Sequence, residues 1–267
     1  MTFSYASQTV LLTGASSGIG ARFARELAAR GSSLVLVARR RDRLDDLADA
    51  LRHDHGVAVT VVPADLTSPT VASEIKAATD AAGVRVTSLI NNAGFGTFGA
   101  FVEEDPDRLE AEISVDVSAP VRLTSTFLPD LLSAGDGMLV NVASMAAYTP
   151  TPRMAVYGAA KAFVLSFTEA LWAELKGTGL TVFALSPGAT STEFNSVVGT
   201  EDATAGARPR TAADVVSTAL SHLESTSPNP SVIDGRTNRV AAAGLRLMSR
   251  RRVAMAMDRL TDPARRR

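Results

Sequence analysis

The sequence predicts an α/β fold: a doubly wound parallel sheet with helices on both faces. Continuous apolar runs, which are typical of strands buried on both faces, alternate along the chain with segments of helical periodicity. A glycine-rich turn joins the first of these runs directly to the first helical segment. The length of 267 residues and the hydrophobic content of 46% are sufficient for a sizeable core. We therefore expect residues 1–267 to form a single domain.

The glycine-rich turn predicts a nucleotide-binding loop. Apolar residues 10–12 lead into Gly14, Gly18 and Gly20, and a helix is expected to begin at about Gly18. Glycine allows the backbone to approach a ligand where a Cβ atom would collide. The free N–H groups of the first helical turn would face an anion such as the pyrophosphate of a dinucleotide. A purely structural turn is the alternative, because the spacing differs from Gly-x-Gly-x-x-Gly.

The later elements follow in alternation. Apolar runs predict further strands at 33–38, 57–62, 88–90, 138–142 and 180–185. Helical spacing predicts helices from Gly18 to Gly31, around Leu44, Leu47 and Leu51, and over 69–82, 105–132 and 154–176. The helix at 105–132 opens with an Asp-Pro cap and is expected to bend near Pro120.

Two arginines after the second strand favour NADP over NAD. In a dinucleotide fold, the residue about 20 positions past the last glycine meets the adenosine ribose. Arg39 stands at that place, followed by Arg40, and a guanidinium favours a 2′-phosphate where an acid would bind the hydroxyl. A solvated helix start without a phosphate contact is the alternative, because residues 41–46 carry ordinary surface charge.

Polar residues at the ends of the next two strands complete the expected cofactor site. Asp65 follows the third strand and could accept from the adenine amino group, although a turn role is the alternative. The segment Asn91-Asn92-Ala93-Gly94 follows the fourth strand, and its small residues allow the backbone to lie against a flat ligand. An asparagine amide there can tie adjacent strand ends together.

Ser144, Tyr157 and Lys161 are the candidate catalytic residues. Tyr157 and Lys161 are four residues apart, on one face of the expected helix. An ammonium near the phenol favours the phenolate and is expected to lower the pKa of Tyr157 from about 10. Ser144 follows the fifth strand and can donate a hydrogen bond to a carbonyl oxygen. Charge builds up on that oxygen during hydride transfer to a ketone, so this set suits carbonyl reduction.

These motifs resemble the short-chain dehydrogenase/reductase family. The matching segments, in family order over roughly residues 8–195, are Thr13–Gly20, Asp65-Leu66, Asn91–Gly94, Ser144, Tyr157-x-x-x-Lys161, Pro187-Gly188 and Thr192. The resemblance implies a Rossmann-type domain with about seven parallel strands. It implies Tyr157 as acid/base, Lys161 on the nicotinamide ribose and Ser144 as the residue that orients the carbonyl. The residues assigned to the cofactor NADP(H) are Gly14, Ser16, Ser17, Gly18, Ile19, Gly20, Arg39, Arg40, Asp65, Leu66, Asn92, Ala93, Gly94, Tyr157, Lys161, Pro187, Gly188, Thr190 and Thr192.

One position departs from the family pattern. The family usually has an asparagine in the long helix before the catalytic serine, where it holds a water in a proton relay with the lysine. Asp116 stands at that place in this chain. A carboxylate accepts from water and from Lys161, and its charge stabilises the ammonium. We expect a working relay with an altered pH profile; the alternative is a structural Asp116 and a rerouted relay.

Composition excludes several other classes of protein. The net charge of −1 argues against a nucleic-acid-binding protein, and the absence of cysteine excludes disulfides. No signal peptide or membrane-spanning run is apparent, so we expect a cytoplasmic location. The three histidines lack partners at ligand spacing, so we expect no metal site. Small polar residues at 195–211 predict a substrate flap, and residues 236–267 a basic helical extension.

The sequence thus favours an NADP(H)-dependent oxidoreductase that interconverts a carbonyl and an alcohol. Two alternatives are an NADP-binding regulator without turnover and a reductase held at a membrane surface by the basic extension. The resemblance also implies a homo-oligomer, a dimer or tetramer paired through the helices at 105–132 and 154–176. A small hydrophobic or acyl substrate is suggested by the pocket candidates Phe95, Phe98, Met145, Ala146, Tyr148, Met154 and Phe194.

Overall fold

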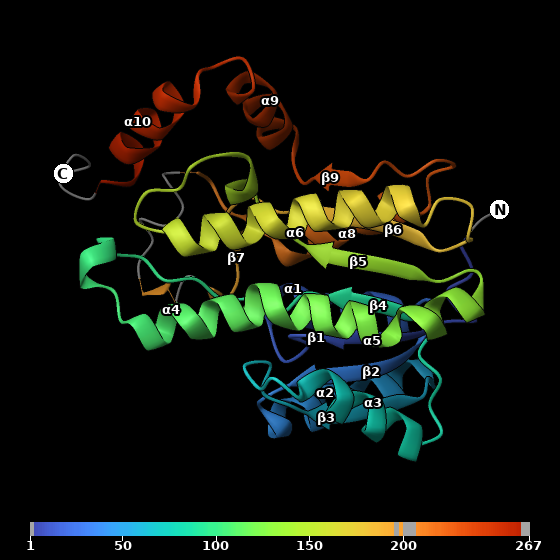
Figure 1. The fold of residues 1–267 in the computed structure, drawn as a ribbon. Coiled ribbons are helices and arrows are strands. Elements are labelled where there is room, and N and C mark those ends of the chain that lie inside the picture. Colours follow the sequence, from blue (N-terminus) through green and yellow to red (C-terminus); the bar gives the residue numbers. More distant parts are fainter. Residues whose placement is uncertain (1–2, 195–197, 200–206, 263–267) are drawn as a thin grey trace.

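A seven-stranded parallel sheet forms the centre of the molecule (Figure 1). The computed structural model describes residues 3–194, 198–199 and 207–262. The strands lie in the order β3-β2-β1-β4-β5-β6-β9, and every neighbouring pair is parallel. Their bounds are β1 (Thr9–Thr13), β2 (Ser33–Ala38), β3 (Val59–Pro63), β4 (Ser88–Asn91), β5 (Met138–Val142), β6 (Thr181–Ser186) and β9 (Ser231–Ile233).

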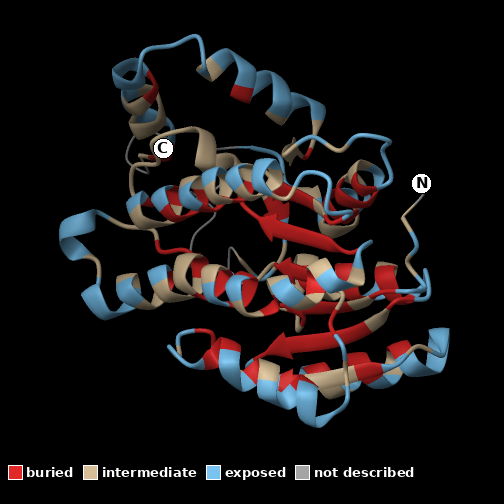
Figure 2. Cartoon of the chain, turned by 45° about the vertical axis from the view of Figure 1, so that its right-hand side comes forward, coloured by how far each residue is buried: buried red, intermediate tan, exposed pale blue. Residues whose placement is uncertain are grey.

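Helices cover both faces of the sheet, as the sequence predicts. One face packs on α1 (Gly18–Ala28), α2 (Arg41–His55) and α8 (Ala212–Leu223). The other packs on α3 (Val71–Ala81), α5 (Ala119–Ala134) and α6 (Ala155–Glu174). In β1, Val10 and Leu12 enter the first of these cores and Leu11 enters the second. Alternate side chains are thus buried on opposite faces, which explains why the strands are continuously apolar. Figure 2 shows that most of the central sheet is buried.

The sheet reverses its direction of winding between β1 and β4. The chain moves from β1 outward to β2 and β3, and then returns to place β4 on the other side of β1. The loops after these two strands therefore diverge and leave a crevice at the carboxyl edge of the sheet. The glycine turn follows β1 and the Asn91–Gly94 segment follows β4, so the two predicted cofactor segments meet at this crevice.

The long helix expected at 105–132 is interrupted where Asp116 stands. It comprises α4 (Pro106–Ile113), a π-helical turn (Ser114–Ser118) and α5. Pro120 has no N–H to donate to the carbonyl of Asp116 four residues earlier, and the Ala119 N–H instead reaches the carbonyl of Ser114. The irregularity predicted near Pro120 is thus a widened turn on its N-terminal side.

Two features of the C-terminal half were not located from the sequence. The seventh strand, β9, has three residues, none of them fully buried. A second small sheet pairs β7 (Thr190–Ser191) with β8 (Arg210–Thr211). These strands are too short to show a period in the sequence.

The basic extension forms two helices, α9 (Arg236–Leu245) and α10 (Arg250–Thr261), which Figure 1 shows beside the main body. Val253 and Thr261 are buried, and Arg153 Nη1 lies 3.1 Å from Asp258 Oδ1, so α10 packs against its own domain. Residues 263–267 of the predicted extension lie outside the described residues. Among the helices that the structure describes, none combines the length and hydropathy needed to cross a bilayer.

Candidate active site

The glycine turn between β1 and α1 has the geometry of a phosphate-binding loop. Gly14 and Gly18 have φ values of +67° and +54°, in the left-handed region that favours glycine. A Cβ atom on Gly20 would lie 2.2 Å from the carbonyl oxygen of Gly14, so the turn closes directly on the helix. Ser17 precedes the helix, and its side chain makes no capping hydrogen bond. The first-turn N–H groups of α1 are therefore free to meet an anion.

The loop after β4 is tied to the glycine turn. Asn92 Nδ2 donates to the carbonyl oxygen of Thr13 at 2.9 Å. The Thr13 hydroxyl accepts from the N–H groups of Asn92 and Ala93 at 3.0 and 3.1 Å. These bonds join the ends of β1 and β4 and fix the width of the crevice. This is the role expected for an asparagine amide at this position.

A cavity of about 520 Å³ runs along the crevice. It lies between the glycine turn, the end of β2 and the loops after β3 and β4. Its lining contains these predicted cofactor residues: Gly14, Ser16, Ser17, Gly18, Ile19, Arg39, Arg40, Asp65, Leu66, Asn92, Ala93, Gly94 and Thr192. Gly20 does not line the cavity; it lies against the carbonyl oxygen of Gly14 and allows the turn to close. Asp65 also accepts a hydrogen bond from the N–H of Thr67 at 3.1 Å, so it has the turn role as well.

The two arginines expected at the adenosine ribose differ in their surroundings. Arg39 is exposed and makes no hydrogen bond or ion pair with the described residues. Arg40 Nη2 donates to the hydroxyls of Ser16 and Ser17 at 3.0 and 3.1 Å. Its Nη1 lies 2.9 Å from an oxygen of Glu193. Arg40 is thereby held over the glycine turn, although the sequence ranks Arg39 first.

Glu193 is an acidic neighbour of these arginines that the sequence did not indicate. Its other oxygen lies 2.5 Å from Nη1 of Arg43. Hydrogen bonds from Arg43 and Arg40 lower the pKa of Glu193 to about 2. The carboxylate is therefore charged at neutral pH and occupies the guanidinium of Arg40, which lines the cavity.

A second cavity of about 320 Å³ adjoins the first and contains the three candidate catalytic residues. Ser144, Tyr157 and Lys161 all line it, together with Pro187, Gly188, Thr190 and Thr192. Ile19, Asn92, Gly94, Thr192 and Phe194 line both cavities, so the two form one continuous cleft. A cofactor in the first cavity would present its far end to Tyr157.

The wall of this second cavity is mainly apolar. Of the predicted pocket residues, Met145, Ala146, Met154 and Phe194 line it, and Phe95 lines the first cavity. Phe98 and Tyr148 line neither; the Tyr148 hydroxyl lies 3.3 Å from the hydroxyl of Ser186. The C-terminal helices α9 and α10 contribute Leu245 and Met257, which the sequence did not indicate.

Tyr157 and Lys161 project from the same face of α6, as predicted. Lys161 Nζ lies 5.6 Å from the centre of the Tyr157 ring and donates to the carbonyl oxygen of Val142 at 3.2 Å. Lys161 lowers the pKa of Tyr157, as does hydrogen bonding with Ser144. Desolvation by burial is a larger effect than either of these, however, and the pKa of Tyr157 is raised overall. The expected acidification of the phenol is therefore offset, because the ring is buried.

Asp116 forms a buried ion pair with Lys161. Asp116 Oδ2 lies 3.0 Å from Lys161 Nζ, and the side chains are 0% and 5% exposed. The other Asp116 oxygen accepts from the N–H of Phe95 at 3.1 Å. Burial is the largest single effect on Lys161 and lowers its pKa, but Asp116, Tyr157 and Glu112 together outweigh burial, and the pKa is raised. Asp116 is the first of these acidic neighbours and helps to keep the amine in its ammonium form.

A second buried acid lies one helical turn before Asp116 and was missed from the sequence. Glu112 is 0% exposed, and among the described residues neither of its carboxyl oxygens makes a hydrogen bond of regular geometry; Thr97 is the polar neighbour that favours the carboxylate. Burial raises the pKa of Glu112 to about 7; Thr97 opposes this rise and the charge of Asp116 adds to it. The spacing Glu-x-x-x-Asp could have indicated a shared helix face, but nothing in the sequence shows that this face is buried.

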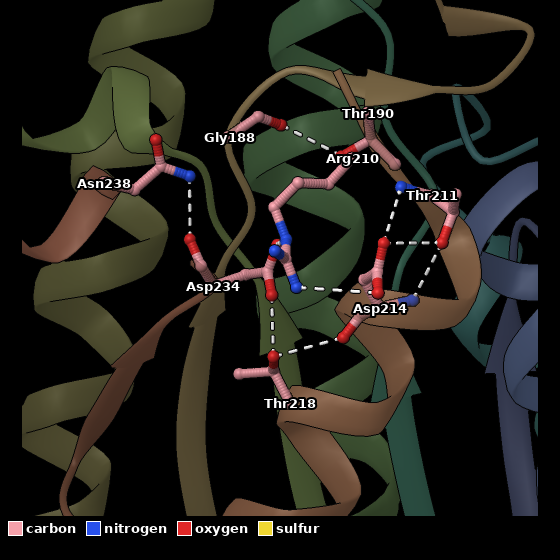
Figure 3. Close-up of polar contacts among 8 residues, drawn as sticks. All are labelled: Gly188, Thr190, Arg210, Thr211, Asp214, Thr218, Asp234 and Asn238. Carbon is pink, nitrogen blue, oxygen red and sulfur yellow. Dashed lines mark hydrogen bonds and ion pairs between the residues drawn. The ribbon is translucent and has the colours of Figure 1, made fainter. Parts of the chain in front are cut away.

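A polar network around Asp234 holds the C-terminal end of the predicted flap at 195–211 (Figure 3). Arg210 Nε lies 2.7 Å from an oxygen of the buried Asp234, whose other oxygen accepts from Thr218 at 2.6 Å. Asn238 donates to the Asp234 carbonyl at 2.7 Å and lines the second cavity. Most of the flap, at 195–197 and 200–206, lies outside the described residues.

The described residues contain no group of three or more histidine, aspartate or glutamate side chains arranged to hold a metal ion. The side chains that meet in the cleft are hydroxyls, a phenol, an amine and carboxyls. These groups can hold a nucleotide and exchange protons with an oxygen atom.

Comparison with known proteins agrees with this geometry. A family model for short chain dehydrogenase matches residues 8–203. A short chain dehydrogenase of Pseudocercospora fijiensis is 35% identical over 71% of this chain, and the match spans 62% of that relative's length. A sulfoacetaldehyde reductase of Chromohalobacter salexigens is 38% identical over 70% of this chain and 74% of its own.

Solved structures with a similar fold include another short-chain dehydrogenase. The structure of a short-chain dehydrogenase from Sphingobium yanoikuyae in complex with NADPH superposes with a TM-score of 0.79 at 36% identity, covering 90% of this chain and 93% of that one. The cleft at the crevice of a parallel sheet, the family match and these relatives lead to one assignment. The chain belongs to the short-chain dehydrogenase/reductase family of oxidoreductases.

Proposed function

We propose that this protein is a cytoplasmic NADP(H)-dependent oxidoreductase that interconverts a carbonyl and an alcohol on a hydrophobic or acyl substrate. The observation that carries the proposal is the cleft in which Ser144, Tyr157 and Lys161 adjoin a nucleotide-sized crevice. Alcohol and carbonyl chemistry follows from the family; the choice of NADP and of substrate class is our inference.

The residues of the first cavity fit a dinucleotide. A Cβ atom on Gly14 or Gly20 would collide with the turn itself or with Asn92, so these glycines let the turn close tightly on the helix and on the loop after β4. Gly14, Gly18 and the hydroxyls of Ser16 and Ser17 line the cavity that this arrangement leaves. Arg39 and Arg40 would hold the 2′-phosphate, which supports NADP over NAD. The solved relative from Sphingobium yanoikuyae, which contains NADPH, supports the same choice.

The side chains of the second cavity would manage the proton of the reaction. A bound nicotinamide supplies or accepts the hydride. Ser144 would donate a hydrogen bond to the carbonyl oxygen, and Tyr157 would give its proton to that oxygen as negative charge develops there. Lys161 stabilises the phenolate that results, because its ammonium lies beside the ring. In the oxidative direction Tyr157 would accept the proton from the alcohol.

The substrate class follows from the cavity wall. Met145, Met154 and Phe194 lie beside Tyr157, and Leu245 and Met257 extend the apolar surface toward the C-terminal helices. A cavity of about 320 Å³ whose exposed wall is mainly apolar favours a hydrophobic substrate over a sugar, and the hydroxyls and amides that also line it can bind the reacting oxygen.

A homo-oligomer is part of the proposal. Phe163 on α6 is 42% exposed and stacks on Phe167, one turn later, with ring centres 5.8 Å apart. An exposed aromatic pair on one of the helices expected to pair subunits supports a contact between two copies. Light scattering would give the number of subunits, and Phe163→Glu is expected to reduce it.

The test is a titration of the purified protein with NADPH and NADH, followed by a panel of carbonyl substrates with the tighter of the two. We expect tighter binding of NADPH and its consumption with hydrophobic ketones or aldehydes. Arg39→Asp should weaken NADPH binding much more than NADH binding, by about tenfold or more, because a charge-assisted bond to the phosphate is lost.

Arg41→Asp is the matched control, since Arg41 lies outside the cavity and pairs with Asp45. Equal loss for the two cofactors in the Arg39 variant would contradict the phosphate assignment. Tight binding of NADPH without consumption on any carbonyl would instead favour a regulator without turnover. Tyr157→Phe should abolish consumption while NADPH still binds.

A further inference from the structure

The long helix before β5 places two carboxyl groups in the interior beside the catalytic residues. Glu112 is the seventh residue of α4, and Asp116 lies in the π-helical turn that follows, four residues later. Both side chains are 0% exposed. Asp116 is paired with Lys161 and with the N–H of Phe95, but Glu112 has no ion-pair partner among the described residues, and hydrogen bonding from Thr97 offsets its burial only in part.

An unpaired carboxylate is costly in such a place, because burial removes its hydration without compensation. The cost falls greatly when the carboxyl holds a proton and is neutral. The group that is present is therefore one that binds a proton within the protein interior.

The groups that face Glu112 come from three elements. Asp116 lies on its own helix, and Glu104 and Thr97 lie in the segment between β4 and α4. Tyr157 and Lys161 lie on α6, which packs against α4, and the charge of Glu112 raises the pKa of both. The acidic neighbours favour the protonated form of Glu112, so its pKa of about 7 rests on burial and like charge together.

We propose that Glu112 is a positioning residue that stores the proton with which Tyr157 is restored after each carbonyl reduction. The inference rests on the proposed function. It extends the expected proton relay of Tyr157, Lys161 and Asp116 to a fourth buried group.

In reduction, the O–H bond of Tyr157 breaks and a new O–H bond forms on the product alcohol. Lys161 loses one N–H proton as the phenol is restored. The carboxyl O–H of Glu112 then breaks, and its proton passes by way of Asp116 to the amine of Lys161. Glu112 is left as a carboxylate, which takes one proton from solvent before the next turnover. Oxidation runs the same transfers in reverse.

The consequence for stability can be measured without any cofactor or substrate. The pKa of Glu112 is raised from 4.5 to about 7 in the folded protein, so the folded state binds more protons than the unfolded state between these values. This contribution to the free energy of unfolding is fully present below about pH 4.5 and is lost as the pH rises through about 7.

The first experiment compares the wild type with Glu112→Gln and Glu110→Gln by urea unfolding between pH 4.5 and 8. Glu110 is exposed on the same helix, so its variant is the matched control. As the pH rises over this range, we expect the free energy of unfolding to fall in the wild type and in the control, and to fall clearly less in Glu112→Gln. Equal slopes in all three would overturn the proposal, because Glu112 would then hold no extra proton.

The second experiment is the pH profile of kcat for carbonyl reduction. In the wild type and in Glu110→Gln, kcat should fall as the pH rises, with a midpoint near pH 7. In Glu112→Gln this fall should be absent, while KM stays similar to that of the wild type. An unchanged profile in Glu112→Gln contradicts storage of the proton even if the variant is active. If the wild type reduces no carbonyl, the proposed function fails, and the unfolding slopes still decide whether Glu112 carries the proton.

If Glu112→Gln does not fold, the proposal can still be tested on the wild type. Infrared titration of the wild type follows the carbonyl band of a buried carboxylic acid directly. A band that disappears with a midpoint near pH 7 supports the proposal. The absence of any protonated carboxyl above pH 6 would overturn it.

Discussion

Arg40 and Glu193 form an ion pair that connects the start of α2 to the segment that follows β7, with Arg40 Nη1 and Glu193 Oε2 2.9 Å apart. Both residues line the first cavity. The same carboxylate also holds Arg43. The pair therefore lies in the cavity that we propose for the cofactor, and Arg40 is one of the two cations proposed to bind the 2′-phosphate of NADP.

Replacing Glu193 with glutamine should strengthen NADPH binding. The variant frees the guanidinium of Arg40 and removes a negative charge that repels the phosphate, so we expect a gain of about twofold to fivefold, the range of exposed ion pairs. Binding of NADH should change little, because NADH carries no 2′-phosphate. The measurement is a fluorescence titration of both cofactors at low and high salt. A weaker affinity for NADPH would show that Glu193 positions Arg40 for the phosphate instead of competing with it.

Replacing Asp116 with asparagine should move the pH profile of alcohol oxidation to lower pH. The charge of Asp116 raises the pKa values of Tyr157 and Lys161. Oxidation needs the phenolate, so a lower pKa of Tyr157 makes that form available at lower pH. The profile of kcat against pH for the two proteins is the measurement. Glu110→Gln serves as the control, and an Asp116→Asn profile that matches the wild type would count against the relay.

Replacing Arg210 with alanine should destabilise the folded protein by roughly 1–3 kcal/mol, because a buried carboxylate loses its cation. Asp234 is 0% exposed and would keep only the Thr218 hydroxyl on its side chain (Figure 3). Urea unfolding at pH 7 gives the change in the free energy of unfolding.

Adding Asp234→Asn to the Arg210 variant should restore part of that loss, since an amide is less costly than an unpaired carboxylate when it is buried. Arg210→Ala with wild-type stability would show that solvent already compensates Asp234. KM for the carbonyl substrate should rise in the same variant, because Arg210 and Asp234 hold the segments on which Gly188 and Asn238 line the second cavity.

The sequence by itself determined the fold class, six of the seven strands of the sheet and the three catalytic candidates. These features depend on local patterns: continuous apolar runs for buried strands, glycines for a tight turn, and a spacing of four residues that places Tyr157 and Lys161 on one helix face. Each pattern is set by backbone geometry over a few residues. The strand β9 was not located, because three half-buried residues show no period.

The tertiary structure decided which charges meet and which are buried. Glu193 follows Arg40 by more than a hundred residues, and only the folded chain brings the two together. Glu112 and Glu110 are two residues apart on one helix, yet Glu112 is buried near the candidate catalytic residues and Glu110 is exposed. The pKa of a carboxyl depends on its hydration and on charges from distant segments, which no local pattern in the sequence records.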